Sequence, residues 1–218
     1  SGYHGWQDWY IGTTTRNAGV PAAVSDLSKK YVYGDTASLE KLFAEYPDQI
    51  ACVIMEPVGV VEPAEGYLQA TKDLCKKNGA LLIFDEVLTG FRIAYGGAQE
   101  RYGVVPDLAC YAKALANGYP LSVIGGRRDV MELFDEIFFS FTFGGDAISL
   151  AASQATLAKM QSEPVFEHLW RQGQKLQDGY NSLARENGVG DFTSCIGLAP
   201  RTVATFTDPE SGNDSPAL

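Results

Sequence analysis

The feature that most constrains the fold is an uninterrupted apolar run, Ala80 to Phe84, that stops at Asp85 and Glu86. The run follows a helical pattern over residues 65–77, which an Asn-Gly pair closes. A short strand that is apolar at every position is typical of a parallel sheet buried on both faces. The two carboxylates would then lie at the carboxyl edge of the sheet, where open α/β folds build their sites.

The remaining patterns alternate between strands and helices. Residues 1–33 are predicted to be loop, with room for one short strand. Further strands are predicted at Ile50–Met55, Leu108–Tyr111, Leu121–Ile124 and Phe138–Phe143, and further helices from a cap at Asp35 or Thr36, over 147–160, and from Pro164 as first helical residue to Gly188. This alternation predicts an α/β fold with a largely parallel or mixed central sheet.

Composition narrows the possible partners and compartment. The 27 acidic and 17 basic residues give a net charge of −10, which argues against nucleic acid or an anionic membrane as the main partner. The four cysteines are irregularly spaced and are interpreted as reduced thiols of a cytoplasmic protein. Neither of the two histidines has metal-ligand spacing, and no apolar run or leader indicates a membrane or export.

The Asp85-Glu86 pair allows three interpretations. It could be a solvated strand end, or the Walker B segment of a nucleotide hydrolase, in which an apolar run precedes Asp-Glu. A Walker B segment needs a phosphate loop of the Gly-x-x-x-x-Gly-Lys-Ser/Thr type, and this sequence contains none. The third interpretation is a carboxylate that serves a cofactor at the sheet edge.

Lys113 is the only charged residue between Asp107 and Arg127, and its neighbours are small and apolar. Such a lysine either extends its amine to solvent or is held for use. Desolvation lowers the pKa of an ammonium group and frees the amine for Schiff-base chemistry. Taken alone, a lysine of this kind is more often structural.

In combination these residues indicate pyridoxal phosphate. That cofactor needs a lysine for the imine, a carboxylate for the ring nitrogen, an aromatic side chain against the ring, and donors for the phosphate. Asp85 and Lys113 follow successive predicted strands, and Tyr3 with His4 supplies an aromatic candidate. The ordered set is far more specific than any member.

Four stretches resemble class III aminotransferases: residues 2–10 (GYHGWQDWY), 55–58 (MEPV), 82–92 (LIFDEVLTGFR) and 106–120 (PDLACYAKALANGYP). The resemblance covers nearly the whole sequence and is strongest to glutamate-1-semialdehyde 2,1-aminomutase and the aminotransferases grouped with it. It implies the large domain of a fold type I pyridoxal-phosphate-dependent transferase, a mostly parallel sheet with helices on both faces. Residues 1–190 would be the central part of this domain, and 191–218 the start of a truncated C-terminal small domain.

The resemblance also implies roles around the cofactor ring. Lys113 would form the imine and then move the substrate proton. Asp85 would pair with the ring nitrogen, Val87 would pack on one ring face, and Tyr3 would stack on the other. Tyr3 could also be an ordinary packing aromatic.

Three further residues match family positions near the cofactor. Glu56 corresponds to an active-site glutamate near cofactor or substrate, although a strand-end carboxylate would look the same. His4 either contacts the cofactor or holds its loop. Thr142 corresponds to the threonine that reaches the phosphate bound by a neighbouring subunit, although it could be a plain strand residue. The loop at 11–26 occupies the place of the aminomutase's mobile gate, or is a surface loop.

The sequence also departs from the family pattern. The family's phosphate-binding loop, upstream of Tyr-His-Gly, and most of its C-terminal domain are expected to lie outside this sequence. Ala112 replaces the usual glycine before the lysine and adds a methyl group near the cofactor. Gln7 stands where relatives often have histidine.

Two functional hypotheses follow from the sequence. The first is a homodimeric pyridoxal-phosphate enzyme, an aminotransferase or aminomutase, that moves the amino group of a small amine or amino acid. The second is a truncated, non-catalytic remnant that keeps the α/β core and a dimer surface. Lys113, Asp85 and Thr142 favour the first hypothesis, and the missing phosphate loop favours the second.

Overall fold

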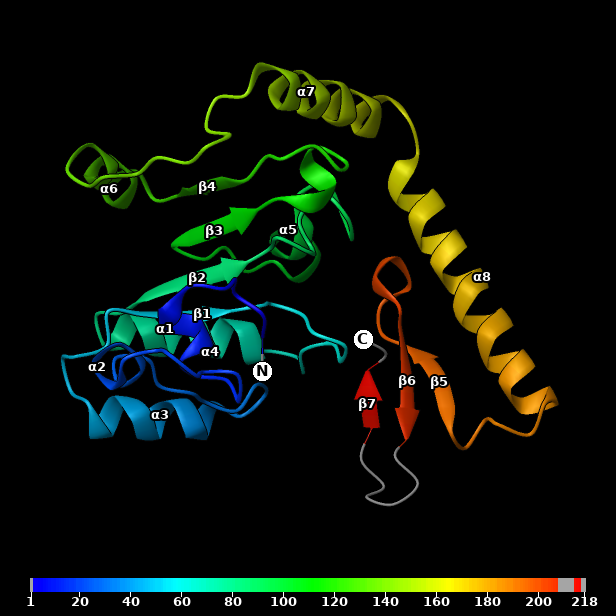
Figure 1. Cartoon of the computed structure of the whole chain (residues 1–218), viewed down its shortest axis with the longest axis horizontal. Helices are drawn as coiled ribbons and strands as arrows, with labels where there is room; N and C mark the ends of the chain where they lie inside the picture. Colours follow the sequence, from blue (N-terminus) through cyan, green and yellow to red (C-terminus); the bar gives the residue numbers. More distant parts are fainter. Residues whose placement is uncertain (1, 208–213, 217–218) are drawn as a thin grey trace.

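Three strands paired in parallel form the centre of the structure. The computed structural model describes residues 2–207 and 214–216. The central sheet has the order β1-β2-β3-β4, with β1 at Cys52–Met55, β2 at Leu81–Asp85, β3 at Leu108–Tyr111 and β4 at Val123–Gly126 (Figure 1). The first three strands run parallel, and β4 runs antiparallel to β3. The predicted α/β fold with a mostly parallel sheet is therefore confirmed.

Two helices build the layer beside β1 and β2. Helix α3 spans Thr36–Glu45 and α4 spans Tyr67–Lys77; α4 packs against β2, and α3 packs against α4. Asp35 caps α3, because its carboxylate accepts the N–H of Ala37 at 2.9 Å. Of the two caps that the sequence allowed, the structure selects Asp35.

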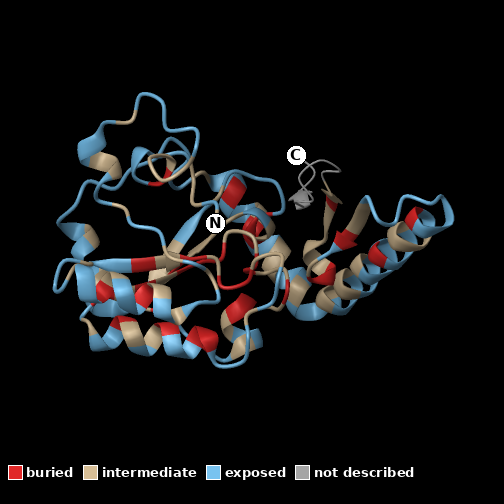
Figure 2. Cartoon of the chain, turned by 90° about the horizontal axis from the view of Figure 1, so that it is seen from below, coloured by how far each residue is buried: buried red, intermediate tan, exposed pale blue. Residues whose placement is uncertain are grey.

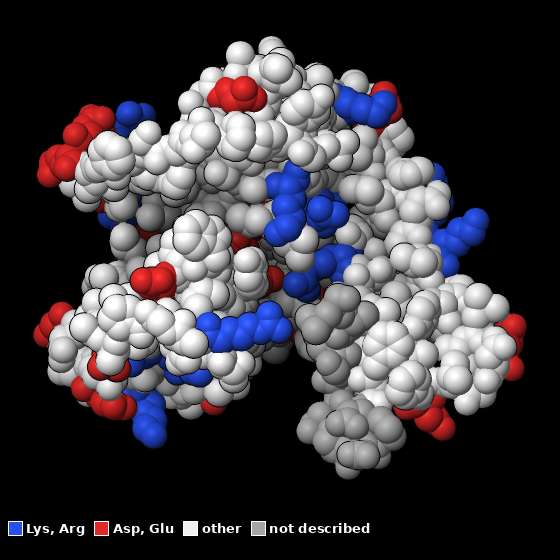
Figure 3. All heavy atoms as spheres, in the orientation of Figure 1, with Lys and Arg blue, Asp and Glu red and all other residues white. Residues whose placement is uncertain are grey.

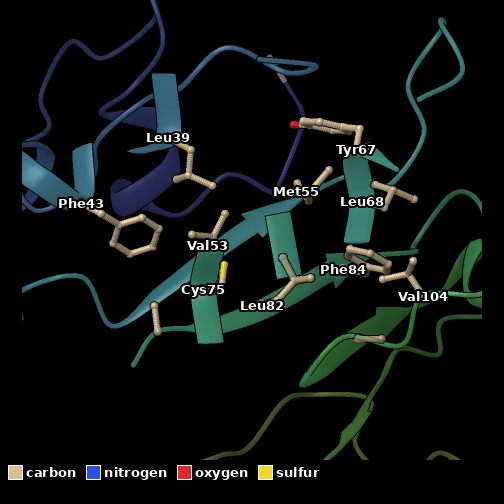
Figure 4. Close-up of a cluster of buried hydrophobic side chains, with 12 residues drawn as sticks. Leu39, Phe43, Val53, Met55, Tyr67, Leu68, Cys75, Leu82, Phe84 and Val104 are labelled. Carbon is tan, nitrogen blue, oxygen red and sulfur yellow. The ribbon is translucent and has the colours of Figure 1, made fainter. Parts of the chain in front are cut away.

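The main hydrophobic core fills the space between this helical layer and the strands (Figure 4). Leu82 and Phe84 on β2 are 0% exposed, which places this strand at the centre of the core. They pack with side chains from α3, α4, β1 and the loops, among them Leu39, Phe43, Val53, Met55, Tyr67, Leu68, Cys75 and Val104. Figure 2 shows that buried residues gather at the large sheet and its adjoining loops.

The C-terminal part is built on one long helix. Helix α7 spans Ala147–Ser162 and α8 spans Val165–Glu186, with Pro164 at the cap rather than at the first helical position. Helix α8 packs against a second, antiparallel sheet of β5 (Thr193–Ile196), β6 (Val203–Thr207) and β7 (Asp214–Pro216) (Figure 1). Residues 208–213 and 217–218 of the expected small domain lie outside the described residues, and the division at residue 190 stays a prediction.

Short elements complete the chain: α1 (Asp8–Ile11), α2 (Ala22–Ser25), α5 (Gly97–Tyr102), α6 (Arg128–Met131), and the 3-10 turns η1 (Lys113–Leu115), η2 (Glu132–Asp135) and η3 (Ala199–Arg201). Residues 2–33 are mostly loop, as predicted. They contain α1 and α2 as regular elements, and the short strand that the sequence allowed is not formed.

The strand expected at Phe138–Phe143 is also wrong. The segment is irregular and ends in a turn, and Phe138, Phe139, Phe141 and Phe143 are all exposed. Aromatic residues raise strand propensity, but a strand also needs a partner edge for its N–H and C=O groups. Of the described strands, β4 pairs only with β3, and none pairs with this segment.

Two general findings concern thiols and helices. All four cysteines are free, as the sequence predicted. Within residues 2–207 and 214–216, none of the helices combines the length and apolar character needed to cross a membrane.

Replacement of Phe84 by alanine should lower the free energy of unfolding by about 3–5 kcal/mol, because it leaves a cavity in a core that cannot fully collapse. Urea denaturation followed by circular dichroism measures the change. The control is Leu183→Ala on α8, where the side chain is 59% exposed, and the cost should stay within about 0.5 kcal/mol. Equal costs at both positions would contradict the assigned core.

Candidate functional site

The register of the parallel strands brings three predicted site residues to one edge of the sheet. Met55 pairs with Phe84, and Asp85 pairs with Cys110. Glu56 follows β1 directly, Asp85 ends β2, and Lys113 lies two residues beyond the end of β3. Because parallel strands present their carboxyl ends at the same edge, all three residues lie there.

Asp85 is buried at this edge, with 7% of its surface exposed. Its Oδ2 atom lies 2.7 Å from Nδ1 of His4, whose side chain is 8% exposed, and its Oδ1 atom accepts the N–H of Val87 at 3.1 Å. The structure thus brings His4, Asp85 and Val87 together. His4 ties the N-terminal segment to the carboxylate, the loop-holding arrangement that the sequence left open.

Lys113 begins the η1 turn and is exposed. Its φ of 40° lies in the left-handed region, which costs an L-amino acid about 1–2 kcal/mol. Within the described residues, no hydrogen bond or ion pair engages its amine. Strain of this kind persists where the surrounding structure imposes it, commonly at functional sites.

The lysine opens onto a hollow of about 580 Å³. Its walls come from the loop after β2, the segment around η1, and helices α7 and α8, including Arg92, Lys113, Asn117, Thr156, Lys159 and Leu169. Figure 3 shows Lys and Arg side chains gathered beyond the carboxyl ends of β2 and β3, whereas most visible acidic side chains lie at the periphery. The net charge of −10 therefore does not describe this edge, which is locally basic.

Glu56 connects two segments that are distant in sequence. Its Oε1 atom accepts the backbone N–H of Tyr3 at 2.8 Å, and its Oε2 atom accepts from Nη2 of Arg201 at 3.1 Å. The Tyr3 side chain is 65% exposed, and its ring meets that of Tyr10 edge-on at 5.9 Å. The sequence suggested Tyr3 and Glu56 but not Arg201, which follows an unremarkable Leu-Ala-Pro segment.

Thr142 does not join this group within the chain. It lies exposed in the turn before α7, and no hydrogen bond or ion pair in the described part of the chain connects it with Asp85 or Lys113. Its expected contribution across a subunit interface stays a prediction.

Glu86 was noted in the sequence only as the second half of the Asp-Glu pair, but in the structure its carboxylate holds neighbouring segments together. It is 0% exposed, and its carboxylate accepts from Thr89 Oγ1 at 2.9 Å, from Ala98 N at 2.6 Å and from Gln99 Nε2 at 3.0 Å. Gln99 Nε2 also donates to the Tyr111 hydroxyl at 2.5 Å. A buried carboxylate thus ties the start of α5 to the end of β3.

A glycine makes room for this carboxylate. Gly97 adopts a φ of 65°, and a Cβ at this position would collide with Oε2 of Glu86. Glycine tolerates both the conformation and the close approach.

Among the residues that the structure describes, no three His, Cys, Asp or Glu side chains are placed to hold a metal ion.

Comparison with known proteins places this arrangement in a family. A sequence profile of the family described as aminotransferase class-III matches residues 3–195. The chain belongs to the class III aminotransferase family. The resemblance inferred from the four sequence stretches is thereby confirmed.

Curated relatives of the chain include two proteins named glutamate-1-semialdehyde 2,1-aminomutase. The protein from Natranaerobius thermophilus is 37% identical over 98% of this chain and 54% of its own length. The protein from Desulforamulus reducens is 39% identical over 86% of this chain and 47% of its own length. The chain therefore spans about half the length of the curated relatives it matches.

Two solved structures share the fold of this chain. The FumI protein of Sphingopyxis sp. MTA144, in its PLP internal aldimine form, superposes with a TM-score of 0.86 at 29% identity, over 95% of this chain and 50% of that protein. An omega-transaminase from Sphaerobacter thermophilus gives a TM-score of 0.79 at 27% identity, over 94% of this chain and 51% of that protein.

Replacement of Glu86 by glutamine should lower the free energy of unfolding by about 1–3 kcal/mol, because an amide would point N–H groups at donors that need an acceptor. Urea denaturation measures the loss. Glu40→Gln, at an exposed position of α3, keeps the same chemical change without the network and should be nearly neutral. A neutral Glu86→Gln would show that the network does not stabilise this edge.

Proposed function

We propose that this chain carries the pyridoxal-phosphate site of an aminotransferase or aminomutase. The observation that carries the proposal is the placement of Lys113 and the buried Asp85 at the carboxyl ends of neighbouring parallel strands. The relatives support it, since they are named as aminomutases, as a transaminase, and as a protein in a PLP form.

The chemistry of the side chains fits pyridoxal phosphate. Asp85 receives one described hydrogen bond at each oxygen, so a carboxylate oxygen can still accept from a protonated ring nitrogen. The amine of Lys113 has no competing partner among the described residues. The Lys and Arg side chains gathered at this edge suit the anionic phosphate of the cofactor, because they supply positive charge and hydrogen-bond donors.

In the proposed mechanism, pyridoxal phosphate supplies a ring that draws electrons from the carbon bearing the amine. Asp85 keeps a positively charged ring nitrogen protonated, since a close carboxylate favours the charged form. His4 and the Val87 N–H orient this carboxylate. Lys113 would hold the cofactor covalently through its amine. Once the amine of a substrate takes that place, the released Nζ of Lys113 would take and return the substrate proton as general base and acid.

The remaining assignments concern the flanks of the ring. We assign Val87 to one ring face and Tyr3 to the other, and Glu56 to positioning, because it holds both the Tyr3 backbone and Arg201. The substrate would be a small amine or an amino acid. The relatives include aminomutases and transaminases, and they do not favour the alternative of a non-catalytic remnant.

We also propose that the chain acts as a homodimer. The segment before α7 exposes a cluster of large apolar side chains: Leu133, Ile137, Phe138, Phe139, Phe141 and Phe143. Apolar patches of this kind mark protein interfaces, and Thr142 lies within it. A second copy that covers the patch would bring Thr142 to its partner's cofactor phosphate.

Four free thiols support a reducing compartment, which we take to be the cytoplasm.

Lys113 should be the residue that binds the cofactor covalently. The purified protein is incubated with pyridoxal phosphate and reduced with borohydride, and the modified lysine is mapped by mass spectrometry. We expect the mass increment at Lys113, and its loss in Lys113→Ala. Lys159→Ala is a matched control, since Lys159 lines the same hollow but pairs with Glu163 at 2.7 Å. Equal labelling of surface lysines in wild type and Lys113→Ala would refute the assignment.

A charge placed in the aromatic patch should dissociate the dimer. Phe138 is 94% exposed, so Phe138→Glu removes no packing within the chain, but it would bury an uncompensated charge at the proposed interface. Light scattering after size exclusion should show a shift from dimer to monomer. Leu176→Glu on α8, where the side chain is 58% exposed, should leave the dimer intact. A monomeric wild type, or a dimeric Phe138→Glu, would contradict the proposed interface.

A further inference from the structure

Tyr111 joins the turn that carries Lys113 to the loop after β2. It is the last residue of β3 and lies two positions before the lysine. Its ring packs against that of Phe91, with the two centroids 5.6 Å apart. The ring also covers Gly90 so closely that a Cβ there would collide with it, and glycine allows this approach. The end of β3 is therefore packed on the loop that follows β2.

The Tyr111 hydroxyl is held by one side-chain amide. Gln99 Nε2 donates to the hydroxyl at 2.5 Å and to Oε1 of the buried Glu86 at 3.0 Å. A side-chain amide nitrogen has two N–H groups, so these bonds use both of them. An ionised carboxylate only accepts hydrogen bonds, which determines the end of the amide that faces Glu86. The hydroxyl of Tyr111 thus has a partner whose orientation is fixed.

Two residues with left-handed backbones lie beside Tyr111. Phe91 has a φ of 55° and Lys113 has a φ of 40°, and both line the hollow of about 580 Å³. Such a conformation costs an L-amino acid free energy and persists where the surrounding structure imposes it. Tyr111 contacts the ring of Phe91 and is separated from Lys113 by a single residue. One side chain is therefore placed to hold both strained positions.

We propose that Tyr111 is a positioning residue that holds the Lys113 turn in the conformation in which the lysine amine meets the cofactor. It acts through its hydrogen bond with Gln99 and its ring contact with Phe91. The inference rests on the proposed function and extends it, because it names the side chain that prepares the lysine before the cofactor arrives. Gln99 acts through Tyr111 and carries the same constraint back to Glu86.

The first test follows the turn itself in the cofactor-free protein. The Leu115 N–H donates to the Ala112 carbonyl at 2.9 Å and closes the turn, so its hydrogen exchange reports on the turn. Tyr111→Phe keeps the ring but leaves a Gln99 N–H without its acceptor. Exchange at Leu115, followed by NMR, should become roughly five- to tenfold faster. The amides of β1 and β2 should exchange as in wild type, whereas a merely structural role would speed them too.

Two further variants accompany this measurement. Tyr119→Phe makes the same chemical change just beyond η1, where the side chain is 52% exposed, and should leave exchange at Leu115 unchanged. Gln99→Met keeps the chain length and removes the donor, so it should speed exchange at Leu115 at least as much as Tyr111→Phe. Adding Tyr111→Phe to Gln99→Met should change little, since both remove the same bond.

The second test is covalent labelling of Lys113 with pyridoxal phosphate and borohydride. In Tyr111→Phe, the cofactor concentration that gives half-maximal labelling should rise about five- to tenfold, because a smaller fraction of the protein holds the competent turn. The proposal is overturned if folded Tyr111→Phe exchanges at Leu115 as wild type does, if exchange rises equally in β1 and β2, or if half-maximal labelling is unchanged. A wild type without label at Lys113 would refute the cofactor proposal, whereas exchange at Leu115 would still show whether Tyr111 holds the turn.

Discussion

The structure depends on the parallel pairing of β1, β2 and β3. The continuous apolar run of β2 can be buried on both sides only if neighbouring strands satisfy its backbone groups. Asp107 adds to this pairing at the start of β3, because its carboxylate accepts the N–H of Leu82 at 2.8 Å and an Arg127 N–H at 2.9 Å. With the register fixed, Glu56, Asp85 and Lys113 must share one edge.

The two adjacent carboxylates at the end of β2 have different environments. Asp85 receives one backbone N–H and His4, and keeps capacity for a ligand. Glu86 accepts hydrogen bonds from Thr89, Ala98 and Gln99, so its carboxylate serves the fold rather than a ligand. The network around Glu86 reaches Tyr111, just before the strained turn at Lys113. One carboxylate thus supports the geometry in which the other can act.

Local patterns in the sequence predicted the elements with strong periodicity. Residues 108–111 form the expected strand, and the expected helices around α3, α4, α7 and α8 are present with shifts at their ends. The strand at Phe138–Phe143 failed, because propensity does not reveal whether a partner edge exists. The predicted strand at 121–124 lies at Val123–Gly126 and runs antiparallel to β3.

The sequence predicted those parts of the site that the order of the strands determines. It did not predict the parts that depend on contacts between residues far apart in the sequence. Asp85 and Lys113 follow successive strands, so their shared edge follows from topology. The contacts of Glu56 with Arg201 and of His4 with Asp85 join residues 145 and 81 positions apart. No local pattern encodes such pairs, and a single sequence holds no record of which distant residues meet. The exposure of Lys113 also depends on how η1 packs, which composition does not show.

The most direct test of the account is the protonation state of the cofactor nitrogen that Asp85 would hold. Pyridoxal phosphate labelled with ¹⁵N in the ring is bound to wild type and to Asp85→Asn, and the ¹⁵N chemical shift is recorded by NMR at pH 8. We predict the shift of a protonated ring nitrogen in wild type and of a neutral one in the variant, because only the carboxylate stabilises the positive charge. The same shift in both proteins would show that Asp85 does not hold the cofactor, and the proposed site would be wrong.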